Sequence, residues 1–173
     1  MTENIKTSIG EINIKKAGIE DEEAVLTIVR DATNWLEGKG IPQWTAYLSE
    51  NGRRFVQKRI KNDVVYLASF QGEIIGTVAI LWEDPSIWEV KGSDGLAGYI
   101  HSLAILRRFE GKQVGKDILR WAMDTIRTQR SFIRLDCMAE NVRLCRYYEE
   151  MGFAPVGQKT FPNGWLDKLY ERN

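Results

Sequence analysis

A glycine-bearing turn at residues 110–116 carries the residue types best suited to chemistry, and its sequence is Glu-Gly-Lys-Gln-Val-Gly-Lys. An apolar run at 96–106 precedes it and an amphipathic stretch follows it to about Gln129, so we expect a buried strand before it and a helix after it. Backbone N–H groups in such a turn converge on an anion, and a helix start adds roughly half a positive charge. The expected guest is a phosphate or pyrophosphate group.

The charges near this turn agree with an anionic guest. Around a single acid, Glu110, the sequence places four cations: Arg107, Arg108, Lys112 and Lys116. Charge-assisted hydrogen bonds from such groups contribute about 1.5–3 kcal/mol each. Glycines also end strands and begin helices in proteins that bind no phosphate, so the turn alone does not decide the function.

Two common nucleotide-binding motifs are excluded. A P-loop has four residues between its glycines, whereas three separate Gly111 from Gly115. A P-loop also has Ser or Thr after Gly-Lys, whereas Asp117 follows Lys116 here. The dinucleotide-binding fingerprint Gly-x-Gly-x-x-Gly is absent as well. A phosphate site at this turn is therefore of another kind.

Hydrophobic periodicity predicts four helices. One begins after Asp21 as its cap and stops at Gly38, and a second covers 51–61 with Phe55 and Ile60 facing inward. The others follow the turn to about residue 129 and cover 141–151. The expected inward face of the first helix consists of Val25, Ile28, Val29, Ala32 and Trp35.

Seven strands are expected between these helices. The runs 64–70 and 74–82 are joined by Gln71-Gly72-Glu73 and should pair antiparallel. The alternation of strand and helix from 96 to 158 fits a right-handed crossover in a partly parallel sheet. The expected strands lie near 12–14, 64–70, 74–82, 96–106, 132–138, 153–158 and 165–171.

Two strings of this sequence resemble a known family. They are YIHSLAILRRFEGKQVGKDIL at Tyr99–Leu119 and NVRLCRYYEEMGF at Asn141–Phe153, and together they resemble the GNAT superfamily of acetyl-CoA-dependent N-acetyltransferases. In that family the first string is the strand, pyrophosphate loop and helix of the cofactor site, and the second is a helix bearing an asparagine and a tyrosine. The resemblance implies an α/β fold with a mixed, mostly antiparallel twisted sheet of about seven strands flanked by about four helices, in one domain over residues 1–173.

The resemblance also implies roles for individual residues toward acetyl-CoA. Asn141 would hydrogen-bond the cofactor, and Tyr148, about two helical turns further on, would point at the sulfur. The backbone that would pair with the pantetheine arm, as an added strand does, is that of Leu103, Ala104 and Ile105. The amides that would hold the pyrophosphate are those of Gly111, Lys112, Gln113, Val114, Gly115 and Lys116.

The chemistry of acetyl transfer gives Tyr148 a specific task. Attack of a neutral amine on a thioester expels a thiolate whose conjugate acid has a pKa of about 8.5, and a tyrosine with a pKa of about 10 can donate a proton or a hydrogen bond to it. Tyr148 is therefore the expected general acid. Without Asn141 and the upstream turn, it would read as one more half-buried aromatic residue of a helix.

The turn departs from the family's usual pattern, Gln/Arg-x-x-Gly-x-Gly/Ala, at Glu110 and Gln113. Glu110 places a negative charge near a dianionic guest, and Gln113 adds a side chain where the backbone normally approaches the phosphate closely. These departures motivate an alternative to the enzyme: a noncatalytic acyl-CoA-binding or regulatory module with a GNAT-like fold.

An acceptor amine must lose a proton before it attacks, so a base is required. The candidates are His101 on the expected central strand, Asp136 on the next strand and Glu83 in an acidic loop. His101 has the most suitable intrinsic pKa, although a lone histidine on a strand is more often structural. Asp136 could equally be a strand residue that bonds to the backbone.

Aromatic and acidic residues also suggest where an acceptor binds. Trp44, Trp82 and Glu83 are the expected contacts of a cationic amine, which ring faces and negative charge attract. The residues expected to extend this cleft are Trp88, Asp84 and Glu89. Large aromatic residues are also common in cores and acidic loops are commonly solvated, so the acceptor stays open between a small amine, an amino acid derivative, an antibiotic-like compound and a peptide N-terminus.

Composition limits the other possibilities. The 24 basic and 24 acidic residues balance, which argues against nucleic acid or a membrane surface as a partner. His101 is the only histidine, so no metal is expected. The two cysteines suggest reduced thiols, and no run is long enough to span a bilayer, so a cytoplasmic protein is expected. The family resemblance is compatible with a homodimer that pairs through edge strands near the C-terminus.

Overall fold

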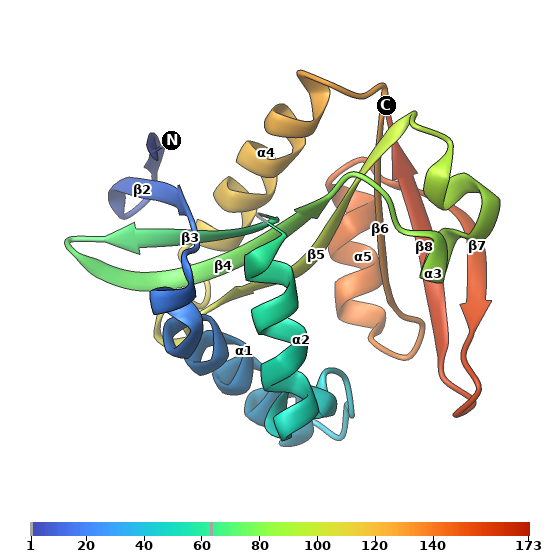
Figure 1. Ribbon diagram of the computed structural model, residues 1–173, viewed down its shortest axis with the longest axis horizontal. Helices are drawn as coiled ribbons and strands as arrows, with labels where there is room; N and C mark the ends of the chain where they lie inside the picture. Colours follow the sequence, from blue (N-terminus) through green and yellow to red (C-terminus); the bar gives the residue numbers. More distant parts are fainter. Residues whose placement is uncertain (1, 63) are drawn as a thin grey trace. The chain divides into compact units, whose positions relative to one another are not determined.

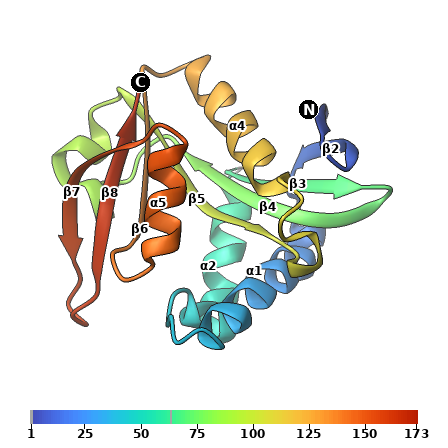
Figure 2. The ribbon, with the colours of Figure 1, turned by 180° about the vertical axis from the view of Figure 1, so that it is seen from behind.

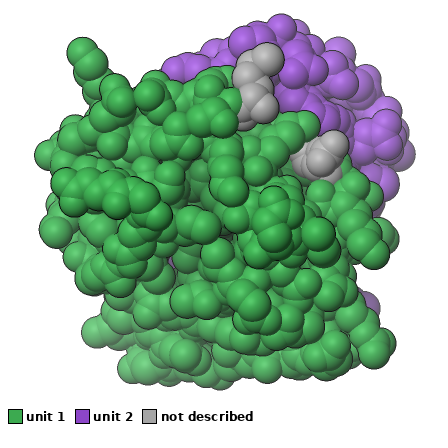
Figure 3. Space-filling model, turned by 60° about the vertical axis from the view of Figure 1, so that its left-hand side comes forward, with its two compact units in different colours: residues 1–80, 102–122 green, residues 81–101, 123–173 purple. Residues whose placement is uncertain are grey.

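The computed structural model describes residues 2–62 and 64–173, and its chain divides into two compact units (Figure 3). Unit 1 consists of residues 1–80 and 102–122, and unit 2 of residues 81–101 and 123–173. The chain therefore passes from one unit to the other three times. The expectation of a single domain over 1–173 stays a prediction.

Unit 1 contains an antiparallel meander. β1 (Thr2–Thr7) pairs with β2 (Gly10–Lys16), β2 pairs with β3 (Val65–Phe70), and β3 pairs with β4 (Glu73–Leu81). Gln71, with a φ of 50°, precedes Gly72, with a φ of 84°, in the turn between β3 and β4. Two left-handed residues are typical of the tight turns that match strand twist, so the predicted hairpin is confirmed.

Helices cover both faces of the unit 1 strands. α1 (Glu22–Glu37) and α2 (Glu50–Lys61) lie on one side of β3 and β4, and the first turns of α4 (Val114–Arg127) lie on the other (Figures 1 and 2). On the α4 side, the ring centroids of Tyr66 and Trp121 are 5.0 Å apart. A Cβ at Gly76 would lie 3.0 Å from the Cδ1 of Ile118, so glycine permits this close packing.

Unit 2 contains four neighbouring strands between helices. On one face packs α5 (Val142–Glu150), whose Tyr148 contacts Tyr170, and on the other packs α3 (Pro85–Trp88), whose Trp88 contacts Tyr99. The core on the α3 face contains the buried Trp88, Ala97 and Tyr99. The elements are α3 (Pro85–Trp88), the first part of β5 (Ala97–Ile105), β6 (Phe132–Met138), α5 (Val142–Glu150), β7 (Ala154–Thr160) and β8 (Leu166–Arg172).

Within residues 2–62 and 64–173, eight strands form one mixed sheet in the order β1-β2-β3-β4-β5-β6-β8-β7. β5 and β6 are parallel, as the predicted crossover requires, and the pairs of β8 with β6 and β7 are antiparallel. The mixed, mostly antiparallel sheet is therefore confirmed, with eight strands and five helices in place of seven and four.

The differences from the sequence prediction have simple physical causes. β1 was not expected because its sequence, TENIKT, is polar and its strand is an exposed edge, and α3 is only four residues long. Phe55 was expected to face inward but is 43% exposed, and Val56 is buried in its place. In α1, Leu36 is buried and Trp35 is only half-buried because its ring packs under the guanidinium of Arg107, 3.8 Å away.

Candidate active site

The turn at 110–116 has the backbone of an anion-binding loop. Gly111 and Gln113 both have left-handed φ angles, 75° and 62°, and α4 begins at the next residue, Val114. At the start of α4 the N–H groups of Lys116 and Asp117 donate to the carbonyl of Gln113, at 2.9 and 3.1 Å, whereas those of Val114 and Gly115 have no carbonyl one turn earlier to bond. Gln113 thus keeps the left-handed backbone that glycine adopts more easily, and the loop can present its N–H groups to an anion.

The fold itself does not require glycine at position 115. A Cβ there would make only an ordinary contact, 3.9 Å from the Cδ1 of Ile105. Glycine in a helix is less favourable than alanine by about 1 kcal/mol. A glycine that costs stability and relieves no packing conflict is consistent with the close approach of a ligand to the backbone.

Two of the four cations predicted to surround the anion are engaged by acids. Arg107 forms an ion pair with Glu110, and Arg108 forms one with Glu73. Among the described residues, neither Lys112 nor Lys116 forms an ion pair. Arg107 thus compensates the negative charge of Glu110, and the effect of Glu110 on cofactor binding stays a prediction.

The predicted pantetheine strand lies next to an unusual residue of β5. The parallel pairing of β5 with β6 covers Ala97 to Ile100, and the segment Leu103–Ile105 lies beyond it. Ser102, just before that segment, has a φ of 50°. A non-glycine residue in the left-handed region inside a strand bends the strand and is associated with functional sites.

Tyr148, the predicted general acid, is a buried residue of α5 in unit 2. Its exposed fraction is 8%, and its ring contacts those of Tyr147, Phe153 and Tyr170. Burial, together with smaller effects of neighbouring groups such as Cys137, raises the pKa of Tyr148 well above its ordinary value. The phenol is therefore protonated at neutral pH and can act as a donor.

Asn141 has a structural role that the sequence did not reveal. It is the N-cap of α5, and its Oδ1 accepts a hydrogen bond from the N–H of Leu144 at 3.2 Å. Such a cap contributes about 1 kcal/mol to helix stability. The predicted helix over 141–151 is thus confirmed with Asn141 as its cap, and its role toward a cofactor stays a prediction.

His101 and Asp136, the predicted bases, lie together in unit 2. The Nδ1 of His101 is 3.7 Å from an oxygen of Asp136, and its Nε2 is 3.0 Å from an oxygen of Asp84. One ligand atom from each of these three residues lies within 4.8 Å of the other two. An imidazole and two carboxylates can move protons, and they are also donors that bind divalent metals.

Asp167 adds a fourth titratable group to this cluster. It follows the first residue of β8 and shares a hydrogen bond with Asp136. Burial and the nearby Asp136 carboxylate raise the pKa of Asp167 to about 7. Two carboxylates that share one proton near neutral pH form a proton reservoir. This pair could not be predicted, because β6 and β8 are distant in the chain.

The predicted acceptor residues do not all behave as expected. Trp44 is half-buried in unit 1, where its ring contacts Tyr47, while Trp82 belongs to unit 2, where Arg130 lies 5.4 Å from its ring. Glu83 is exposed. Trp88 is buried in the core and Asp84 is buried against His101, and their place in an acceptor cleft stays a prediction.

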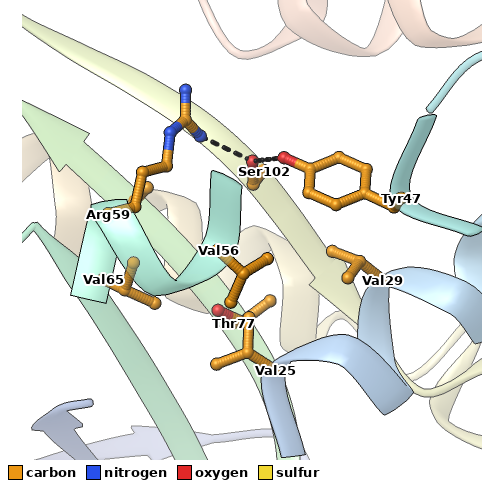
Figure 4. Close-up of a pocket in the computed structure, with 9 residues that line it drawn as sticks. Val25, Val29, Tyr47, Val56, Arg59, Val65, Thr77 and Ser102 are labelled. Carbon is orange, nitrogen blue, oxygen red and sulfur yellow. Dashed lines mark hydrogen bonds between the residues drawn. The ribbon is translucent and has the colours of Figure 1, made fainter. Parts of the chain in front are cut away.

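A small pocket in unit 1 contains polar residues that the sequence analysis missed (Figure 4). Ser102 Oγ accepts a hydrogen bond from Arg59 Nη1 at 2.8 Å and lies 2.8 Å from the hydroxyl of Tyr47. The three residues come from α2, β5 and the 3-10 turn Thr45–Leu48. An arginine in a helix that otherwise buries Val56 and Ile60 was the only signal that could have indicated this group.

Within residues 2–62 and 64–173, no helix combines the length and apolar character needed to cross a membrane.

Comparisons with known proteins agree with this geometry. A family model described as the acetyltransferase (GNAT) family matches residues 29–153, which include the turn, His101, Asp136 and Tyr148. The chain is 31% identical over 143 residues to the uncharacterized N-acetyltransferase YesJ of Bacillus subtilis, covering 80% of this chain and 79% of that protein.

Two further relatives extend the likeness over most of the chain. A glucosamine 6-phosphate N-acetyltransferase of Arabidopsis thaliana is 26% identical over 155 residues, or 89% of this chain and 93% of that protein. A crystal structure of a GNAT-family acetyltransferase from Listeria monocytogenes superimposes with a TM-score of 0.80 at 27% identity, covering 98% of this chain and 99% of that one.

Proposed function

Because the chain belongs to the GNAT family of acetyltransferases, we propose that it is an N-acetyltransferase that transfers the acetyl group of acetyl-CoA to the primary amine of an acceptor. The observation that carries the proposal is the loop before α4. Gly111 and Gln113 have left-handed backbones there, and the packing of the fold does not require a glycine at position 115, so the loop has features that favour a phosphate ligand. Acetyl-CoA supplies an activated acetyl thioester.

The residues around the loop fit such a ligand. The N–H groups of Gly111, Gln113, Val114 and Gly115 hold the diphosphate. Those of Lys112 and Lys116, which were also expected to do so, already donate to the carbonyls of Phe109 and Gln113, and these two residues add positive charge through their side chains. The backbone of Leu103–Ile105 binds the pantetheine arm as a neighbouring strand would, because this part of β5 lies beyond the residues that pair with β6. Asn141 gives a further polar contact while its Oδ1 caps α5.

Tyr148 acts as the general acid. Its raised pKa keeps the proton on the phenol oxygen, which donates a hydrogen bond to the thiolate that leaves during transfer. A thiolate is less basic than a phenolate, so this hydrogen bond strengthens as charge develops on sulfur without complete transfer of the proton, and the released thiolate takes its proton from solvent.

His101 and Asp136 accept a proton from the acceptor amine. An ammonium group must lose one proton, and the cluster of Asp84, His101 and Asp136 offers basic atoms next to the shared proton of Asp136 and Asp167. Asp84 holds the imidazole of His101 in one orientation through the 3.0 Å contact. The acceptor is a small amine or a peptide N-terminus, with Trp44, Trp82 and Glu83 as proposed contacts.

Free thiol release from acetyl-CoA in the presence of a broad panel of amines tests this function. We expect release with at least one amine, and we expect Tyr148→Phe to lower the turnover rate at least about tenfold while CoA binding persists. An unchanged rate in Tyr148→Phe would remove this residue from the mechanism. CoA binding without acetyl transfer to any amine would favour the noncatalytic module, which none of the comparisons favours at present.

A further inference from the structure

The pocket in unit 1 combines an apolar lining with a polar edge. Figure 4 shows Arg59, Ser102 and Tyr47 in a row along one side and valines below them. Arg59 is the one charged residue among the nine described residues that line the pocket. The remaining lining residues are Val25, Val29, Val56, Val65, Thr77 and Ala79.

The polar edge consists of hydrogen-bonding side chains that hold one another in place. A guanidinium only donates, so in its 2.8 Å bond with Arg59 the oxygen of Ser102 is the acceptor. The hydroxyl of Tyr47 lies 2.8 Å from the same oxygen. Phe55 packs against the guanidinium of Arg59, with its ring 4.3 Å from Cζ, which explains why an apolar ring is exposed here. The direction of the guanidinium is thus fixed from two sides.

Two independent features indicate that this edge binds a ligand. The strand residue Ser102 keeps a left-handed φ of 50°, which costs free energy and aims its hydroxyl at Arg59 and Tyr47. The helix that carries Arg59 is also strongly basic. Of the charged residues in α2, Glu50 is the only acid, and the cations are Arg53, Arg54, Lys58, Arg59 and Lys61.

We propose that Arg59, Ser102 and Tyr47 bind an oxyanion group of the acceptor, so that the preferred acceptor is an amine that also carries a phosphate or a carboxylate. This inference rests on the proposed acetyltransferase function and adds the chemical class of its acceptor. The apolar lining strengthens the attraction between the guanidinium and an anion, because few competing water molecules fit beside them.

The size of the pocket limits what enters it. The cavity measures about 250 Å³ including its opening to solvent. Pockets that enclose a whole ligand measure about 300–1,000 Å³. The acid group therefore enters the polar edge, while the rest of the acceptor stays outside the pocket.

Matched pairs of amines test the proposal. Acetylation is measured with phosphoethanolamine against ethanolamine and with β-alanine against propylamine, so that the two arms separate phosphate from carboxylate. We expect kcat/KM to favour the acidic member of at least one pair by about tenfold or more, the usual size of a charge-assisted contact. Arg59→Gln removes this preference mainly by raising KM. Arg54→Gln, which removes the same charge from an exposed position of α2, retains it.

Tyr47→Phe keeps the ring and removes only the hydroxyl, so it tests the polar edge in a protein that is expected to fold. We expect a smaller loss of preference than in Arg59→Gln. Equal kcat/KM values for the acidic and neutral amines, or a preference that Arg59→Gln leaves unchanged, would overturn the proposal while acetyl transfer itself stands.

A binding measurement separates this proposal from the proposed function. If no amine is acetylated, calorimetry with phosphoethanolamine and β-alanine in the presence of saturating CoA still tests the anion site. Heat of binding that is lost in Arg59→Gln and kept in Arg54→Gln supports the site, and the absence of binding to the unaltered protein overturns it.

Discussion

Two polar clusters lie two residues apart on one face of the parallel strands β5 and β6, and they are built differently. In the first, Arg134 is 3% exposed and lies between two carboxylates, with Glu171 at 2.8 Å and Asp94 at 2.9 Å. It also donates to the hydroxyl of Tyr99, its partner in the strand register, at 3.0 Å. This cluster satisfies a buried cation from several directions.

The second cluster has no arginine and consists of carboxylates around a histidine. His101 and Asp136 follow Tyr99 and Arg134 by two residues and so point to the same face. Asp84 and Asp167 complete it, giving three carboxylates around one imidazole. A buried charge requires matched partners, and removing one of them is strongly destabilising. An excess of acids instead keeps an exchangeable proton near neutral pH, which is useful for chemistry.

The largest effect that the comparison predicts is on stability, from Arg134→Met. The change leaves the carboxylates of Asp94 and Glu171 without their buried cation, so the free energy of unfolding should fall by about 3–5 kcal/mol. Denaturant unfolding measures it, with Arg146→Met, an exposed position of the same unit, as the control. A loss no larger than that of the control would show that the first cluster is not structural.

The second cluster should respond in activity rather than in stability. Asp136→Asn removes the basic atom next to His101 and the repulsion with Asp167, so the rate of acetyl transfer should fall by about tenfold to a hundredfold. The free energy of unfolding should change much less than in Arg134→Met.

Alongside this variant, the steady-state rate of acetyl transfer by the unaltered protein is measured with and without EDTA, a metal chelator. A rate that EDTA leaves unchanged agrees with proton transfer, and a rate that EDTA abolishes would assign Asp84, His101 and Asp136 to a metal instead. Full activity of Asp136→Asn would remove the cluster from the reaction.

A smaller effect is expected in the pH dependence of stability. The pKa of Asp167 is about 7 in the folded protein and about 3.9 in an unfolded chain, so the folded state binds more protons between these values. Its contribution is fully present below about pH 4 and is lost as the pH rises through 7. Asp167→Asn should flatten this part of the curve of Tm against pH, and an unchanged slope would contradict the shared proton.

Much of the fold could be predicted from the sequence because the segments with hydrophobic periodicity are long. The hairpin of β3 and β4 and the parallel pair of β5 and β6 follow from apolar runs and turn residues. Strand β1 could not be predicted, because its residues are polar and pair only at the edge of the sheet. Phe55 was misplaced because its ring packs against Arg59, a contact that apolar periodicity does not describe.

The candidate site was predictable only where neighbours in sequence are neighbours in space. The turn at 110–116 is one segment, so its left-handed backbone could be anticipated from Gly111. The pairing of His101 with Asp84 and of Asp136 with Asp167 depends on strand register and on the loop before α3. Such contacts between distant segments have no signature in a single sequence.

The most direct test of the account is the affinity for CoA of Gly115→Val. The Cβ at this position has room within the protein, so the free energy of unfolding should change by less than about 1 kcal/mol. The added side chain would occupy the place of the diphosphate, so calorimetry should show an affinity at least about tenfold weaker than that of the unaltered protein. Unchanged CoA binding by the folded variant would contradict the assignment of the 111–116 loop.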